Sequence, residues 1–236
     1  MKFYRTFLPF KVISFDLDDT LYDNREVIRT ANQEFLSRLQ QTSQISDLNE
    51  ETWQVWKDRV AQQEPVLCED VTTWRKLAMQ RMLEHHGKSA VEIQYISQGV
   101  MQHFLEFRHE ISVPSKTIAI LNLLKQRYRL AAITNGNVTP RRIGLNQFDV
   151  VYCGGLQGRA KPHRDLFHRT AEYFGVRPDE ILHIGDNLIT DVRGAIQAGC
   201  QAGWINLSDK SIREFSDATL LPTMEISDLL QLLDLI

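Results

Sequence analysis

The chain has 236 residues, of which 43% are hydrophobic and 24% charged, a balance typical of a folded globular protein and not of a disordered or fibrous one. Lysine and arginine total 27 against 30 acidic residues, and this net charge of −3 is too balanced to favour nucleic acid as the main partner. The three scattered cysteines indicate a reducing compartment, and no apolar run approaches the roughly 18 residues of a membrane span. We therefore expect a cytoplasmic monomer or homodimer without a nucleic-acid or membrane partner.

The first predicted strand ends in a cluster of acids. Residues 12–15 form a short apolar run, Val-Ile-Ser-Phe, which predicts a buried strand. This run leads directly into Asp16, Asp18 and Asp19. Because unpaired carboxylates are costly inside a sheet, the strand should end there and place these side chains at its carboxyl end.

A long helical stretch follows the acidic cluster. From about residue 24 to residue 109 the apolar residues recur three and four apart, as in Ile28, Ala31, Phe35 and Leu39. This spacing is typical of amphipathic helices, and its repetition along the stretch predicts a small helical bundle.

Strands and helices alternate in the rest of the chain. Apolar runs predict strands at 130–133, 150–152, 181–184 and 202–205, with helices at 117–125, 164–174 and from 187 to about 198, before a polar tail. Alternation of this kind is typical of a doubly wound, Rossmann-like α/β fold with a parallel sheet. We expect residues 1–22 and 111–236 to form this core, with residues 23–110 inserted as a helical cap domain.

Four groups of polar residues stand just after predicted strands or in a loop between them. They are Asp16 with Asp18, Thr134 with Asn135 and Gly136, Lys161 before Pro162, and Asp186 with Asp191. Each group alone is more typical of a turn, a helix cap or an exposed loop than of a site. Because ligands of open α/β sheets bind beyond the carboxyl ends of the strands, the ordered set predicts one site built from all four segments.

This ordered set resembles the haloacid dehalogenase superfamily of phosphohydrolases over nearly the whole chain. The matching segments are FDLDDTL at 15–21, ITNG at 133–136, Lys161-Pro162, and GDNLITD at 185–191. The resemblance implies a core with a helical cap inserted after the first motif, in agreement with the pattern of the elements. It also implies hydrolysis of a phosphorylated small metabolite, a phosphate monoester.

The resemblance assigns roles to the matching residues. Asp16 would be the nucleophile that forms an aspartyl phosphate, Asp18 the general acid and base, and Thr134 and Lys161 would stabilise the phosphoryl charge. The metal would be Mg²⁺, held by Asp16, the backbone carbonyl of Asp18, and Asp186. The predicted phosphate-binding groups are Asp19, Thr134, Asn135 and Gly136. Two interpretations of Asp191 are kept: it is a metal ligand, or it is an acid that the dipole at a helix N-terminus favours.

The expected charges agree with a metal-dependent phosphatase. A phosphate monoester brings about two negative charges to a site that already holds Asp16 and Asp186, and Lys161 alone is too little to compensate them. Mg²⁺ prefers oxygen ligands and binds one or two carboxylates together with a substrate oxygen.

Aromatic residues of the helical stretch are candidates for substrate contacts. Trp53, Trp56 and Trp74 lie at helical spacing, which more often serves a core than a pocket for a planar substrate. Among them, Trp74 with Arg75 is the candidate substrate-binding pair. The contexts of residues 16–24, 70–75 and 133–137 resemble bacterial phosphatases that act on flavin mononucleotide or on the ribitylaminouracil phosphate of riboflavin biosynthesis.

Other functions remain open on the same residues. A haloacid dehalogenase also uses an aspartate nucleophile but would leave Asp18 and Asp186 unexplained. A phosphonatase would need a cap lysine, and Lys57, Lys76 and Lys88 have no diagnostic context. Phosphomutases use similar chemistry, while a signalling receiver combines Asp, Thr, Lys and Mg²⁺ without an insertion of this length. A non-catalytic binding protein is the remaining alternative.

Overall fold

The computed structural model describes all 236 residues and divides them into two compact units. The first contains residues 1–23, 112–136 and 144–236. The second contains residues 24–111 together with the short segment 137–143, which directly follows the motif at Thr134. No helix in either unit combines the length and the apolar composition that a membrane span requires.

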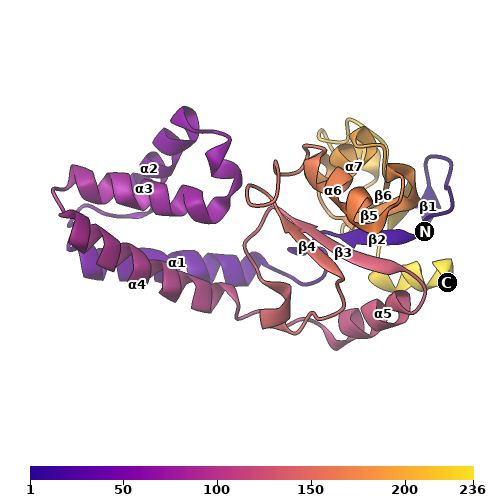
Figure 1. Cartoon of the computed structure of the whole chain (residues 1–236), viewed down its shortest axis with the longest axis horizontal. Helices are drawn as coiled ribbons and strands as arrows, with labels where there is room; N and C mark the ends of the chain where they lie inside the picture. The colour runs from indigo at the N-terminus through magenta and orange to yellow at the C-terminus, as the bar shows by residue number, and fades with distance from the viewer. The chain divides into compact units, whose positions relative to one another are not determined.

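The first unit is built on a sheet of seven strands, in the order β1-β7-β6-β5-β2-β3-β4. Figure 1 labels the first six of them in chain order. The strands are β1 (Lys2–Phe3), β2 (Val12–Phe15), β3 (Arg129–Thr134), β4 (Val150–Cys153), β5 (Ile181–Gly185), β6 (Gln201–Ile205) and β7 (Met224–Ile226). All neighbouring pairs are parallel except β1 with β7. The predicted α/β class is confirmed, since four of the five predicted apolar runs are inner strands of the parallel part of the sheet and the fifth, β4, is its edge strand.

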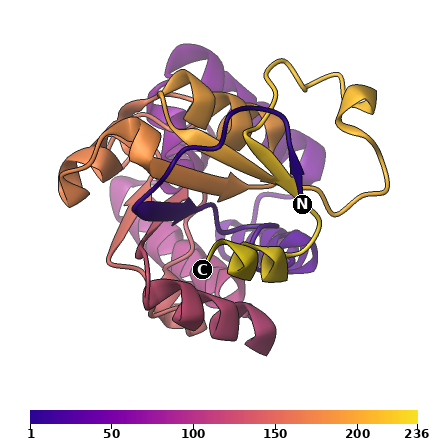
Figure 2. The ribbon, with the colours of Figure 1, turned by 90° about the vertical axis from the view of Figure 1, so that its right-hand side faces the viewer.

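Helices cover both faces of this sheet. They are α5 (Ser115–Lys125), α6 (Asp165–Phe174) and α7 (Gly194–Gln197), the last preceded by a π-helical turn at Leu188–Arg193. The helix α5 and the C-terminal 3-10 helix (Leu229–Leu235) lie on one face, and α6 and α7 lie on the other (Figures 1 and 2). Crossovers in the two directions along the sheet place their helices on opposite faces, because such connections are right-handed.

The polar tail contains a strand that the sequence pattern did not indicate. Strand β7 has a polar residue, Glu225, between two apolar ones, and this residue is only 6% exposed. Its carboxylate accepts hydrogen bonds from Tyr4, Lys2 and Asn206. These partners compensate the burial of the charge, so a segment of tail becomes part of the sheet.

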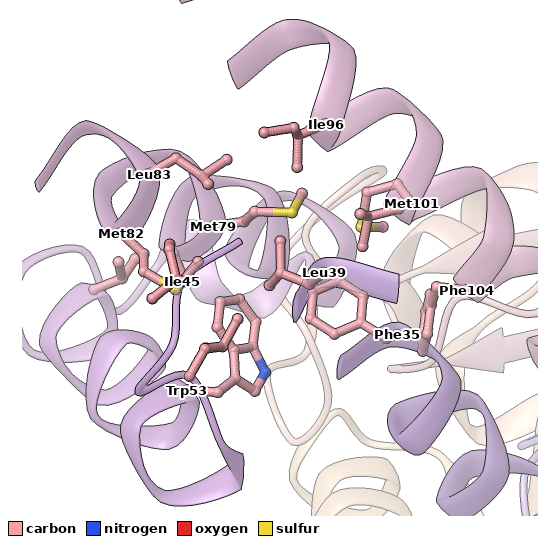
Figure 3. Packing of buried hydrophobic residues seen from close by; sticks show 14 of the residues in the cluster. Phe35, Leu39, Ile45, Trp53, Met79, Met82, Leu83, Ile96, Met101 and Phe104 are labelled. Atoms are coloured by element: carbon pink, nitrogen blue, oxygen red, sulfur yellow. The ribbon is translucent and has the colours of Figure 1, made fainter. Parts of the chain in front are cut away.

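The second unit contains four helices with a shared apolar core. They are α1 (Arg25–Ser43), α2 (Glu50–Gln63), α3 (Val71–His85) and α4 (Ala90–Arg108), with α1 packed on α4 and α2 on α3. Figure 3 shows the buried side chains, among them Phe35, Leu39, Met79 and Phe104. Trp53 lies in this core, 5% exposed, with its ring 5.0 Å from that of Phe35. Trp53 is therefore a core residue of this unit, which is the role that its helical spacing favoured over a pocket.

Candidate active site

The central position of β2 explains why the predicted residues meet. This strand lies between β3 and β5, so the chain order reverses at its carboxyl end. Such a reversal point is the place where ligands bind in doubly wound sheets. Asp16 follows β2 directly, and its backbone N–H donates to the carbonyl of Ile184 on β5 at 2.8 Å. Asp186 follows Gly185, the last residue of β5, at the same edge of the sheet.

Lys161 joins two of the carboxylates at this edge. Its Nζ lies 2.6 Å from Oδ1 of Asp16 and 2.6 Å from Oδ1 of Asp191, and only 1% of its side chain is exposed. Burial alone would lower the pKa of Lys161, but the charges of Asp16 and Asp191 outweigh that effect and raise it. The ammonium group is therefore a permanent positive charge beside the predicted nucleophile.

The side chain of Asn135 holds the backbone of the lysine loop. Its Nδ2 donates to the carbonyl of Lys161 at 2.8 Å, and the N–H of Lys161 donates to its Oδ1 at 2.9 Å. Gly154 allows this close approach, because a Cβ there would lie 2.7 Å from Cβ of Ala160 and 3.0 Å from Oδ1 of Asn135. The Asn135 side chain thus holds the lysine loop, while the prediction that the amides around Asn135 and Gly136 bind phosphate remains a prediction.

Thr134 ends β3 and is 1% exposed. Its hydroxyl oxygen accepts a hydrogen bond from the N–H of Gly136 at 2.9 Å. Since that lone pair is occupied, the hydroxyl hydrogen is left to donate in another direction.

The loop after Asp16 brings further polar groups toward Asp186. The hydroxyl of Tyr22 donates to Oδ1 of Asp18 at 2.8 Å, which orients that carboxylate. Asp19 adopts the left-handed conformation with φ of 59°, uncommon for a residue with a side chain and often found at functional turns. Thr20 then donates to Oδ1 of Asp186 at 3.2 Å. Thr20 was not predicted as a site residue, although it lies inside the first motif.

Three carboxylates form a group that fits a metal ion. One oxygen atom from each of Asp16, Asp186 and Asp191 lies within 4.8 Å of the others. Burial and the charge of Asp191 raise the pKa of Asp186 to about 6, and burial raises that of Asp16 against the opposing charge of Lys161. Three carboxyl groups beside one ammonium group leave negative charge that the protein does not compensate. Their oxygen atoms are the kind of ligand that Mg²⁺ prefers.

Asp191 belongs to this group and does not cap the helix that contains it. The N-terminal cap is Asn187, whose Oδ1 accepts from the N–H groups of Ile189 and Thr190, both at 2.9 Å. Asp191 is 1% exposed and accepts hydrogen bonds from Lys161 and from His183. Burial raises its pKa, but the charge of Lys161 and the hydrogen bond from His183 outweigh this and hold it well below the usual range.

The predicted substrate-binding pair lies in the second unit. The indole Nε1 of Trp74 donates to the backbone carbonyl of Lys57 at 2.9 Å. The guanidinium carbon of Arg75 lies 4.6 Å from the ring centre of Phe35 and 4.1 Å from that of Phe104. Both side chains therefore contribute to packing within the helical unit, and a contact with substrate remains a prediction.

Comparisons with known proteins agree with the site. Residues 10–199 match the profile of the haloacid dehalogenase-like hydrolases. The chain is 39% identical, over 100% of both sequences, to the 5-amino-6-(5-phospho-D-ribitylamino)uracil phosphatase YigB of Escherichia coli. It is 26% identical to the glyceraldehyde 3-phosphate phosphatase of Pyrococcus furiosus, covering 95% of this chain and 93% of that one. The crystal structure of a 2-haloacid dehalogenase from Pseudomonas syringae superposes with a TM-score of 0.88 at 30% identity, covering 95% and 97% of the two chains.

The candidate active site lies at the carboxyl ends of the parallel strands. The match to the family profile and the identity over the full length show that the chain belongs to the haloacid dehalogenase-like hydrolases. Within that family its relatives over the full length identify it as a phosphatase.

Proposed function

We propose that the protein is a Mg²⁺-dependent phosphatase that hydrolyses a small phosphate monoester through an aspartyl phosphate at Asp16. The observation that carries this proposal is the Lys161 ammonium group, 2.6 Å from both Asp16 and Asp191, at the edge of the sheet where Asp186 also lies. A cation in contact with the nucleophile lowers the repulsion that an anionic substrate meets there.

The metal would be held by Asp16, the backbone carbonyl of Asp18, and Asp186, with Asp191 beside them. When bound, Mg²⁺ supplies positive charge for the phosphoryl oxygens and for the three carboxylates. The raised pKa of Asp186 supports this assignment, because burial and, after it, the neighbouring charge of Asp191 destabilise the ionised carboxylate, and a bound cation would offset both effects.

The chemistry is divided into two displacements. An oxygen of Asp16 attacks phosphorus, and the bond between phosphorus and the alcohol oxygen breaks. Protonated Asp18, oriented by Tyr22, donates a proton to the departing alcohol. Water then attacks the phosphorus of the aspartyl phosphate while the Asp18 carboxylate takes a proton from it, which releases inorganic phosphate and restores Asp16.

Groups around the phosphoryl oxygens would stabilise the charge that develops on them. Lys161 supplies an ammonium group, and Thr134 supplies a hydroxyl hydrogen whose direction is set by Gly136. Asn135 contributes by fixing the Lys161 backbone. The backbone N–H of Asn135 is proposed to complete the phosphate site together with Asp19, while the N–H of Gly136 donates to Thr134.

For the substrate we propose the ribitylaminouracil phosphate of riboflavin biosynthesis, with flavin mononucleotide as the second candidate. Identity of 39% over the full length to the Escherichia coli phosphatase for the former compound supports this choice. Trp74 and Arg75 are the proposed contacts for the organic part of the substrate, since a planar ring matches an indole and a guanidinium group.

A dehalogenase is the competing function, and the similarity to a 2-haloacid dehalogenase structure gives it a basis. Displacement of a halide needs neither a proton donor for the leaving group nor a cation for phosphate charge. In this chain Asp18 is oriented by Tyr22, and Asp186 by Thr20. Two carboxylates positioned in this way favour the phosphatase.

The test is a panel of phosphate monoesters and 2-chloropropionate, assayed with Mg²⁺ and with EDTA. We expect phosphate release that requires Mg²⁺, is abolished in Asp16→Asn and persists in Asp209→Asn, which removes the same charge from an exposed loop. Ribitylaminouracil phosphate should have the highest kcat/KM of the panel. Halide release without metal, together with no phosphate release, would overturn the proposal in favour of a dehalogenase.

A further inference from the structure

A buried imidazole lies beneath the carboxylates of the site. His183 is the third residue of β5 and is fully buried. The register of the sheet pairs it with Ser14 of β2. Because side chains alternate along a strand, Ser14 shares a face with Asp16, and His183 shares one with Gly185. The Ser14–His183 pair therefore lies two residues, about 7 Å, below the layer that carries the nucleophile.

Both nitrogens of this imidazole have partners. Nδ1 lies 2.9 Å from Oγ of Ser14, and Nε2 lies 3.2 Å from Oδ1 of Asp191. Ionised Asp191 can only accept, so Nε2 carries the hydrogen and Nδ1 accepts the hydroxyl hydrogen of Ser14. The ring of Phe167 packs edge-on against the imidazole, with centres 5.0 Å apart, and limits its rotation. Burial lowers the pKa of His183, in agreement with a neutral ring.

Asp191 has little freedom around this hydrogen bond. A Cβ at Gly185 would lie 2.5 Å from both Cβ and Oδ2 of Asp191, so the aspartate packs directly on the bare backbone of β5. Its Oδ2 also accepts the N–H of Asn187 at 3.0 Å. With His183 on Oδ1 as well, the carboxylate is fixed in the orientation that contacts Lys161 at 2.6 Å.

We propose that His183 is a positioning residue for the phosphatase reaction: its Nε2–H, oriented by Ser14, fixes Asp191 so that Asp191 holds the Lys161 ammonium group against Asp16. The inference rests on the proposed function, and it adds two residues outside the four matched segments. If His183 were only a buried histidine with satisfied hydrogen bonds, its substitution would lower the stability of the protein but would not specifically lower kcat. The two roles therefore differ in what a substitution changes.

The test compares His183→Leu with His183→Gln. Leucine fills the space without a donor, whereas the amide nitrogen of glutamine can replace Nε2. We expect His183→Leu to lower kcat by about 10- to 100-fold, with a smaller change in KM. Losses of this size are typical when a residue that orients a metal-binding side chain through a hydrogen bond is replaced. His183→Gln should recover most of that loss. Equal kcat in His183→Leu and wild type, or equal losses in both variants, would overturn the inference.

Two further measurements keep the test valid if a His183 variant does not fold. Ser14→Ala should lower kcat, whereas Thr170→Val, which removes another buried hydroxyl, bonded to the carbonyl of Leu166, should not. Nitrogen NMR of the metal-free wild type should show His183 protonated on Nε2 and not on Nδ1; the opposite tautomer would overturn the inference. Absence of phosphate release by wild type would instead refute the proposed function, while the tautomer still tests the hydrogen bonds.

Discussion

Asp186 should make the binding of Mg²⁺ depend on pH. Burial and the charges of Asp191 and Asp19 raise its pKa to about 6 in the metal-free protein. A metal ligand must be ionised, so protons and Mg²⁺ compete for this carboxylate. Below the pKa the ionised fraction falls about tenfold for each pH unit, so protonation of Asp186 alone should make the Kd for Mg²⁺ about tenfold higher at about pH 5 than at about pH 7.5. The raised pKa of Asp16, the other carboxylate ligand, should increase this ratio further.

The same shift has a defined sign for stability. The pKa of Asp186 in the folded state lies above the ordinary value, so the folded protein binds this proton more tightly between about pH 4 and about pH 6. Its contribution to stability is present below about pH 4 and is lost as the pH rises through about 6. Bound Mg²⁺ compensates the charge, so it should stabilise the protein more above pH 6 than below.

Titration calorimetry over this pH range measures the Kd, and thermal unfolding with and without Mg²⁺ measures the stabilisation. In Asp186→Asn the binding should be weaker and its change between pH 7.5 and pH 5 smaller. An equal Kd at both ends of the range in the wild type would contradict the assignment of Asp186 as a ligand.

Three substitutions test other parts of the site. Asp18→Asn should lower kcat by about 10²- to 10⁴-fold with little change in KM, because only proton transfer is lost; steady-state kinetics would contradict this with an unchanged kcat. Gly185→Ala forces a Cβ against Asp191 and should cost about 1–3 kcal/mol in urea unfolding, so wild-type stability would refute the close packing. Asn135→Ala removes both hydrogen bonds to the Lys161 backbone, so it should lower the free energy of unfolding by about 1–3 kcal/mol and also reduce kcat. An unchanged kcat would show that the Lys161 loop keeps its position without Asn135.

The sequence predicted the inner strands because their signal is local. Strands β2 and β5 are short runs that are apolar except for Ser14 and His183 and that stop at Asp16 and at Asp186. Burial on both faces of a parallel sheet produces that pattern. Strand β7 has no such run, since Glu225 interrupts it and finds its partners far away in the chain. The grouping of residues 137–143 with the helical unit likewise depends on contacts that no local pattern encodes.

The candidate site shows the same limit. The motifs indicated which residues converge, but the partner of each side chain depends on the fold. Asp191 is an acid in the first turn of its helix, as the spacing suggested, but the cap is Asn187 and the Asp191 carboxylate contacts Lys161. The side chain of Asn135 contacts the lysine loop 26 residues later in the chain. His183 sits inside an apolar run, where one polar residue gives no indication of its hydrogen bonds.

The central claim is that Asp16 accepts the phosphoryl group, and trapping that intermediate tests it most directly. The enzyme would be mixed with a phosphate monoester that it turns over in the presence of Mg²⁺, quenched in acid within one turnover, digested and analysed by peptide mass spectrometry. We predict one phosphoryl group on the peptide that contains Asp16 and none in Asp16→Asn. A label on another residue, or phosphate release by Asp16→Asn at the wild-type rate, would contradict the account.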